Sequence, residues 1–309
     1  MIFERKHIIS TKDFSRDEID HILDRAEKLE PYARKGHLDI LKNKIIATLF
    51  FEPSTRTRLS FDTAVKRLGG TTIGFDSATT TSISKGETLF DTVKIIESYA
   101  DAIVLRHPKE GAARMASEIS EVPVINAGDG AGHHPTQTLL DLYTMRKECK
   151  KSIGDLNVAI VGDLRYGRTV HSLAYALSLY GAKLSFVSPE QLKMPPSIIS
   201  YLKQHGIELI ETPDITQVLE DADVLYMTRI QKERFPDPGE YLKVAGSYRI
   251  TPEMLNGSTD DMIIMHPLPR VDEIDPGIDS TKYARYFQQS FYGVPVRMAV
   301  LSLVMEAEQ

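Results

Sequence analysis

Short apolar runs alternate with helix-like segments along almost the whole chain, and this alternation limits the possible folds more than any other feature. The runs at 44–51, 102–105, 157–161 and 183–187 have the length of buried strands. Amphipathic segments follow them. Strands that alternate with helices in this way predict parallel sheets covered by helices on both faces.

The pattern restarts after about residue 150, so we predict two domains, which suits a length of 309 residues. Further strands are expected at 71–75, 124–126, 223–227 and 262–265, and helices at 15–29, 55–68, 87–99, 111–120, 135–149, 168–180, 197–205 and 294–308. The last helix could pack on either domain. We predict an α/β fold with two doubly wound parallel-sheet domains, 1–135 with 291–309 and 136–290, and the active site in the cleft between them.

Composition excludes several classes of protein. A net charge of −6 argues against nucleic acid as the main partner. No run of eighteen apolar residues predicts a membrane segment, and the N-terminus lacks the apolar stretch of a secretory signal. Cys149 is the only cysteine, which excludes an internal disulfide framework. The cytoplasm is the expected compartment.

The segment Ser54-Thr55-Arg56-Thr57-Arg58 directly follows the first strand and opens a helix. The first backbone N–H groups of a helix have no partner within the helix, and hydroxyl and guanidinium donors surround them here. This combination predicts a phosphate-binding site. The alternative is an ordinary helix start with two solvated arginines.

Polar residues also follow the other strands, where ligands of open α/β sheets bind. They lie at 82–87, 106–108, 130–137, 162–168, 228–231 and 266–270. The adjacent His133 and His134 could suggest a metal, but their spacing is poor for one ion, and no metal is expected. The 162–168 segment lacks the GxGxxG pattern, so we do not expect a dinucleotide there.

Taken together, these segments resemble the catalytic chains of the aspartate carbamoyltransferase family. The resemblance covers nearly the whole length, and six motifs carry it in order: FFEPSTRTRLSFDTA (50–64), SKGETLFDT (84–92), HPTQTLLDL (134–142), GDLRYGRTVHSL (162–173), TRIQKERF (228–235) and HPLPR (266–270). The related ornithine carbamoyltransferases typically carry a cysteine in the last of these loops. This chain does not, so the aspartate branch is favoured.

The resemblance implies transfer of the carbamoyl group from carbamoyl phosphate to L-aspartate, an early step of de novo pyrimidine biosynthesis. It implies that the first domain binds carbamoyl phosphate and the second binds aspartate. The implied catalytic residues are Arg56, Thr57, Lys85, Arg106 and His134. The implied carbamoyl phosphate ligands are Ser54, Thr55, Arg56, Thr57, Ser82, Arg106, His134, Gln137, Pro267, Leu268 and Pro269. The implied aspartate ligands are Lys85, Arg168, Arg229, Gln231 and Leu268.

The family also implies a homotrimer in which Ser82 and Lys85 reach the active site of a neighbouring subunit. A separate regulatory chain is compatible with the resemblance, and neither cofactor nor metal is needed for the reaction. We expect a neutral His134 to polarise the carbonyl group, because a helix N-terminus opposes its protonation. We also expect Glu52 to pair with Arg168 or Arg234 when the domains close. The remaining alternatives are another amine acceptor or a non-catalytic binding protein.

Overall fold

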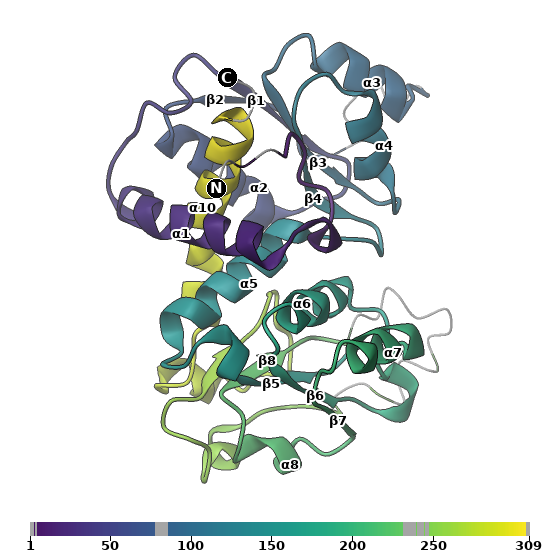
Figure 1. The fold of residues 1–309 in the computed structure, drawn as a ribbon, viewed down its shortest axis with the longest axis vertical. Coiled ribbons are helices and arrows are strands. Elements are labelled where there is room, and N and C mark those ends of the chain that lie inside the picture. Colours follow the sequence, from purple (N-terminus) through teal and green to yellow (C-terminus); the bar gives the residue numbers. More distant parts are fainter. Residues whose placement is uncertain are drawn as a thin grey trace. The chain divides into compact units, whose positions relative to one another are not determined.

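The computed structural model describes residue 3 and residues 5–77, 86–230, 239, 244 and 247–306. The chain divides into two compact units, which we call unit 1 (Met1–Leu140 with Phe291–Gln309) and unit 2 (Asp141–Ser290). Each unit contains one sheet whose strands all run parallel, with helices packed against it (Figure 1). This confirms the predicted α/β class with two parallel sheets.

The sheet of unit 1 has the strand order β2-β1-β3-β4. Its strands are β1 (Ile45–Phe50), β2 (Thr71–Phe75), β3 (Ala102–His107) and β4 (Val124–Asp129). Leu49 near the end of β1 pairs with Phe75 on one side and with Leu105 on the other. Because the strands are parallel and in this register, the loops that follow β1, β3 and β4 leave the same edge of the sheet.

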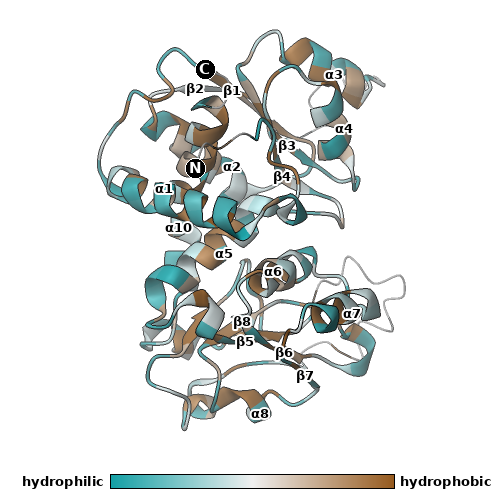
Figure 2. Cartoon of the chain, viewed as in Figure 1, coloured by the Kyte–Doolittle hydropathy of each residue, from teal (hydrophilic) through white to brown (hydrophobic). Residues whose placement is uncertain are grey.

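The helices of unit 1 are α1 (Arg16–Arg34), α2 (Thr55–Arg67), α3 (Leu89–Ile96), α4 (Ala112–Ile119), the start of α5 (Pro135–Glu148) and most of α10 (Tyr286–Glu306). The predicted capping box at the start of α1 is confirmed, since Ser15 and Glu18 exchange hydrogen bonds. Much of α1 is hydrophilic (Figure 2), while residues such as Ile19, Ile22 and Leu23 on its other face are buried.

The sheet of unit 2 has the strand order β7-β6-β5-β8-β9. Its strands are β5 (Asn157–Val161), β6 (Lys183–Val187), β7 (Leu209–Thr212), β8 (Val224–Met227) and β9 (Ile263–Met265). Its helices are the rest of α5, α6 (Arg168–Ser178), α7 (Pro196–Gln204), α8 (Thr216–Leu219) and the start of α10. Strand β7 and helix α8 were not predicted.

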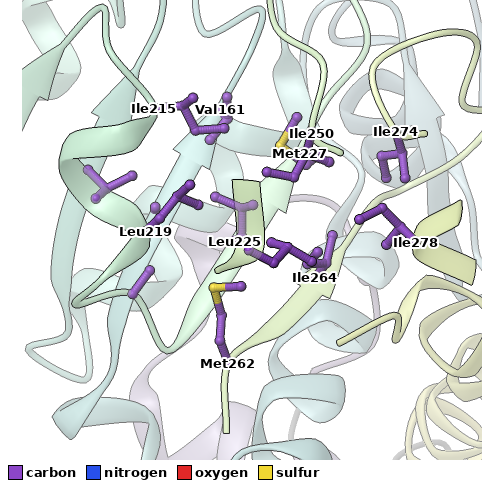
Figure 3. Packing of buried hydrophobic residues seen from close by; sticks show 14 of the residues in the cluster. Val161, Ile215, Leu219, Leu225, Met227, Ile250, Met262, Ile264, Ile274 and Ile278 are labelled. Atoms are coloured by element: carbon purple, nitrogen blue, oxygen red, sulfur yellow. The ribbon is translucent and has the colours of Figure 1, made fainter. Parts of the chain in front are cut away.

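Apolar side chains from the central strands of unit 2 form a continuous core on one face of the sheet. Val161, Leu225, Met227 and Ile264 come from three adjacent strands and pack together (Figure 3). Ile215 is one of several buried residues from connecting segments that close this cluster. The core therefore fixes the carboxyl ends of β5, β8 and β9 with respect to one another.

Within the described part of the chain, no helix is both long and apolar enough to cross a membrane.

Candidate functional site

The start of α2 differs from the starts of α1 and α3 in its local charge and capping. Helices α1 and α3 begin at Ser15 and Thr88, whose side chains accept first-turn N–H groups, and both carry acidic residues in the first turn. In the described structure the N-cap of α2, Ser54, makes no such side-chain bond, and the first turn holds no acidic residue. Neither a capping side chain nor an acidic residue of the first turn therefore offsets the positive end of this helix dipole.

Some residues at the start of α2 are exposed to solvent, and others are buried or paired within the protein. Thr55 and Arg56 are exposed, whereas Thr57 is buried. Arg58 forms an ion pair with Asp76, with 2.9 Å between Nη1 and Oδ2. Arg58 is therefore engaged with the segment after β2.

Arg106 lies beside the end of β1. Its Nη2 is 3.2 Å from Oε1 of Glu52, and its Nη1 donates to the carbonyl oxygen of Ala127 at 3.2 Å. The Arg106 side chain is only 12% exposed, and these two contacts hold its guanidinium in place. The expected partners of Glu52 were Arg168 or Arg234; Arg234 lies outside the described residues, and that pairing stays a prediction.

A buried polar network shapes the loop between β4 and α5. Oδ1 of Asp129 accepts from the backbone N–H of His133 at 2.7 Å and from the amide of Asn126 at 3.0 Å. Oδ2 of Asp129 accepts from the backbone N–H of Gly111 at 2.9 Å. Asn126 is fully buried and Asp129 is 3% exposed, so these bonds are shielded from water. The network sets where α5 begins.

His134 and Gln137 lie at the start of α5. The carbonyl oxygen of His134 accepts from the N–H of Gln137 at 2.9 Å, so His134 begins the helix. The His134 side chain is buried, and that of Gln137 is half-buried. His133 and His107 are close in sequence to this site, and burial lowers the pKa of both, so neither is disposed to carry charge.

In unit 2, the ends of β5 and β8 approach each other closely. Gly162 has a φ of +116°, and a Cβ there would lie 2.4 Å from the carbonyl oxygen of Thr228. The Oγ1 of Thr228 also accepts from the N–H of Asp163 at 3.2 Å. The glycine is thus required for this approach. It places the start of α6, at Arg168, and the second residue after β8, Arg229, at the same edge of the sheet. Arg168 is buried and Arg229 is half-buried.

The loop after β9 contains Pro267, Leu268 and Pro269. Leu268 has a φ of +55°, and its peptide bond to Pro269 is cis. Pro267 and Leu268 are half-buried, and Pro269 is exposed. Arg270 then forms an ion pair with Asp279, with 2.6 Å between Nη2 and Oδ2.

Three predicted site residues, Ser82, Lys85 and Gln231, lie outside the described residues. Among the residues that are described, no group of three or more His, Cys, Asp or Glu side chains is arranged to hold a metal ion. The other predicted residues fall on two sheet edges. Ser54, Thr55, Arg56, Thr57, Arg106, His134 and Gln137 belong to the edge in unit 1, and Arg168, Arg229, Pro267, Leu268 and Pro269 to the edge in unit 2.

The sequence did not single out several buried polar residues that support these edges. Arg297 on α10 is 3% exposed and lies with its guanidinium carbon 5.0 Å from the ring centroid of Phe61, one turn beyond Thr57 on α2. The Asn126 and Asp129 network was also missed. An Asn and an Asp within the last residues of a buried strand, just before a glycine-rich turn, were the available signal.

The comparisons with known proteins agree over the full chain. The family model "Aspartate/ornithine carbamoyltransferase, carbamoyl-P binding domain" matches residues 6–147, and "Aspartate/ornithine carbamoyltransferase, Asp/Orn binding domain" matches residues 154–304. The aspartate carbamoyltransferase catalytic subunit of Methanocella arvoryzae is 81% identical over 305 residues, covering 99% of each chain.

Two solved structures are also similar. The catalytic subunit of M. jannaschii aspartate transcarbamoylase has a TM-score of 0.91 at 56% identity, covering 98% of each chain. The aspartate transcarbamoylase of Trypanosoma cruzi in complex with carbamoyl phosphate and aspartate has a TM-score of 0.92 at 38% identity, covering 97% of each chain.

Proposed function

The chain belongs to the aspartate/ornithine carbamoyltransferase family, and from this membership we propose that it transfers the carbamoyl group of carbamoyl phosphate to the amine of L-aspartate. The products are N-carbamoyl-L-aspartate and phosphate. The observation that carries the proposal is the start of α2, an N-terminus without a side-chain cap in the described structure that presents Arg56 instead of an acidic residue. A phosphate dianion supplies the charge that this helix end lacks.

In the reaction, the aspartate nitrogen attacks the carbonyl carbon and forms the new C–N bond. The resulting tetrahedral intermediate carries negative charge on the former carbonyl oxygen. The C–O bond to phosphate then breaks, and the amine proton leaves with the phosphate. The protein must therefore hold two anions side by side and stabilise the oxyanion, tasks that positioned donors can perform.

We assign the phosphate to Ser54, Thr55, Arg56 and Thr57. The hydroxyl of Ser54 is not used to cap the helix in the described structure, so it is available as a donor. The guanidinium of Arg56 is exposed at the same turn. Charge-assisted hydrogen bonds of this kind contribute about 1.5–3 kcal/mol each.

We assign the carbonyl oxygen to Thr57, Arg106 and His134. Arg106 is suited to this task because its contacts with Glu52 and Ala127 fix the guanidinium before substrate arrives. Such a preorganised donor to an oxyanion is worth about 3–4 kcal/mol of transition-state stabilisation. His134 would donate from a neutral ring.

The carbamoyl NH₂ group needs acceptors. We assign these to the side chain of Gln137 and the backbone carbonyl groups of Pro267 and Leu268, with Pro269 limiting the conformations of that loop.

Aspartate has two carboxylates, and unit 2 offers two guanidinium groups at one sheet edge. We assign the α-carboxylate to Arg168 and the β-carboxylate to Arg229, which Gln231 would steady. Ornithine would require an acidic group to meet its side-chain amine. Two arginines therefore favour aspartate as the acceptor.

We further propose a homotrimer in the cytoplasm, in which Ser82 and Lys85 complete the site of a neighbouring subunit. The segment that carries them precedes α3, where Phe90 is 50% exposed and nearby Tyr99 is 60% exposed. Exposed apolar side chains at α3 are ones that a subunit interface there would cover. A separate regulatory chain could bind such a trimer.

The test is an assay of the purified chain with carbamoyl phosphate and either L-aspartate or L-ornithine, together with a mass measurement of the assembly. Carbamoyl aspartate formed by a particle of three chains supports the proposal. A preference for ornithine would move the chain to the other branch of the family. Tight phosphate binding without product would indicate a binding protein.

A further inference from the structure

A buried histidine and glutamate lie next to the loop that follows β9, and neither has been given a role above. His266 is 1% exposed and Glu273 is 4% exposed. Nε2 of His266 is 2.6 Å from Oε1 of Glu273. Such a pair is costly to bury unless it is well bonded, so its placement beside Pro267 and Leu268 requires an explanation.

The hydrogen bonds of the pair define the tautomer of the ring. Nδ1 of His266 lies 2.7 Å from the backbone N–H of Leu268 and accepts from it. The ring proton is therefore on Nε2 and is donated to Glu273. The other oxygen of Glu273, Oε2, accepts from the N–H groups of Val271 and Asp272, each at 3.1 Å.

The protonation states agree with this pattern. Burial lowers the pKa of His266, which keeps the ring neutral and Nδ1 able to accept. Burial is the largest single influence on Glu273 and acts to raise its pKa, but the interaction with His266 and the hydrogen bonds from backbone N–H groups together outweigh it and leave this pKa lowered. The glutamate is thus an anion whose hydrogen bonds join the start of the 266–273 segment, at His266, to its end.

The backbone of His266 is fixed as firmly as its ring. Its N–H donates to Oε1 of Gln289 on α10 at 2.8 Å. The amide of Gln289 donates to Oδ1 of the buried Asp141 on α5 at 2.7 Å, and the hydroxyl of Tyr226 on β8 donates to Oδ2 at 2.8 Å. The histidine is therefore anchored to two helices and to the sheet of unit 2.

This anchored ring controls the peptide group between Pro267 and Leu268. In the trans arrangement, the N–H and C=O of one peptide group point in opposite directions. With the N–H of Leu268 held on the buried Nδ1, the carbonyl oxygen of Pro267 must point away from the ring. Leu268 itself has a φ of +55°, a left-handed conformation that a leucine rarely adopts without support from its surroundings.

We propose that His266 and Glu273 are positioning residues that aim the carbonyl groups of Pro267 and Leu268 at the NH₂ group of carbamoyl phosphate. The inference rests on the proposed function, because it concerns the same substrate. It adds a source of specificity. Phosphate recognition by α2 does not distinguish carbamoyl phosphate from inorganic phosphate, whereas correctly aimed carbonyl acceptors do.

Two substitutions at His266 separate its two bonds. In His266→Asn, the side-chain oxygen takes the place of Nδ1 and can accept from the N–H of Leu268, but the reach to Glu273 is lost. In His266→Gln, the side-chain amide takes the place of Nε2 and can donate to Glu273, but the acceptor for Leu268 is lost. A third variant, Glu273→Gln, keeps the size of the side chain and removes its charge.

The readout is the ratio of two dissociation constants, for carbamoyl phosphate and for inorganic phosphate, measured by calorimetry on the full chain. We expect His266→Gln to weaken carbamoyl phosphate binding by about tenfold, which corresponds to about 1.4 kcal/mol, with phosphate binding unchanged. We expect His266→Asn to weaken carbamoyl phosphate binding by less than about threefold. Glu273→Gln should fall between the two, and its KM for carbamoyl phosphate should rise more than its kcat falls.

Asp275→Asn provides the matched control. Asp275 caps the short helix Pro276–Ser280 and forms an ion pair with Arg249, so its loss perturbs the same region of unit 2 without touching the Pro267 peptide group. Its dissociation-constant ratio should equal that of the unmodified chain.

The inference would be overturned if His266→Asn and His266→Gln lost carbamoyl phosphate affinity equally. It would also be overturned if affinity for carbamoyl phosphate and for inorganic phosphate fell in parallel. In either case His266 would be a purely structural residue. If either His266 variant does not fold, the ratio of the two dissociation constants in Glu273→Gln provides the test. A ratio equal to that of the unmodified chain would overturn the inference. A failure of the proposed function looks different, because the unmodified chain would then bind carbamoyl phosphate no more tightly than phosphate. That result would remove both proposals.

Discussion

Replacing Asp129 by asparagine tests how the β4–α5 loop places His134. The carboxylate accepts from Asn126, His133 and Gly111 within hydrogen-bond distance and is almost fully buried. Asparagine has nearly the same shape, but one of its two polar atoms is a donor. Whichever way the amide turns, at least one of the N–H groups that now donate to the carboxylate faces another donor.

The cost follows from these contacts. Leaving a buried donor unsatisfied costs about 1–3 kcal/mol. For a unit of this size each kcal/mol lowers the melting temperature by about 2–4 °C, so we expect a decrease on the order of 5 °C. Because the loop fixes the start of α5, we also expect kcat to fall by roughly 10- to 100-fold, the effect of a displacement of about 1 Å at a catalytic group.

The assay compares Asp129→Asn with Asp39→Asn by thermal unfolding and steady-state kinetics. Asp39 belongs to the same unit, but its side chain is 65% exposed and is paired with the exposed side chain of His37. The control should change stability by less than about 0.5 kcal/mol and leave kcat unaltered. The reasoning is refuted if Asp129→Asn has the same melting temperature and the same kcat as the unmodified chain.

Three further outcomes are expected. Arg56→Gln should weaken inorganic phosphate binding by roughly 10- to 100-fold in calorimetry at fixed salt. Arg58→Gln, which loses the ion pair with Asp76, should stay within about twofold of the unmodified chain. Similar losses of phosphate affinity in both variants would contradict the assignment. Burial raises the pKa of Cys149 to about 12 from a usual value near 9, so the folded state binds this proton more tightly. The resulting stability is present below about pH 9 and is lost as pH rises toward 12, and denaturant unfolding of Cys149→Ala should show less of this loss. Gly162→Ala should destabilise the chain by about 1–3 kcal/mol in denaturant unfolding, because the added methyl meets the backbone at the end of β8; unchanged stability would show that this contact relaxes freely.

Much of the fold could be predicted because buried parallel strands leave a strong signal. The predicted ranges 71–75, 157–161 and 183–187 coincide with β2, β5 and β6. Most residues in each range are apolar or β-branched, and polar or turn residues flank it. Their parallel arrangement followed from the helices between them.

The elements that were missed have physical reasons. Strand β7 lies at the edge of its sheet and has two exposed residues among four, so it shows no apolar run. Helix α10 begins at Tyr286, eight residues before the expected start, and continues through Gly293 and Pro295, which usually interrupt helices. A Cβ at Gly293 would lie 2.2 Å from Nη1 of Arg297, one turn further along the same helix, so the buried side chain of Arg297 occupies the space beside the glycine.

The candidate site was predictable only in part. Hydroxyls and arginines at a helix start have a direct chemical meaning, so Ser54 to Thr57 could be read from the sequence. The bonds that orient them could not. The sequence does not show that His266 pairs with the buried Glu273, or that Glu52 forms an ion pair with Arg106, because these contacts depend on the backbone direction in loops.

The most direct test of the central claim is product analysis by mass spectrometry after incubating the purified chain with carbamoyl phosphate and an equal mixture of L-aspartate and L-ornithine. The account predicts carbamoyl aspartate as the product, with its formation strongly reduced in Arg56→Gln. Carbamoyl ornithine as the main product, or no carbamoylated amino acid from a folded chain that binds phosphate, would contradict it.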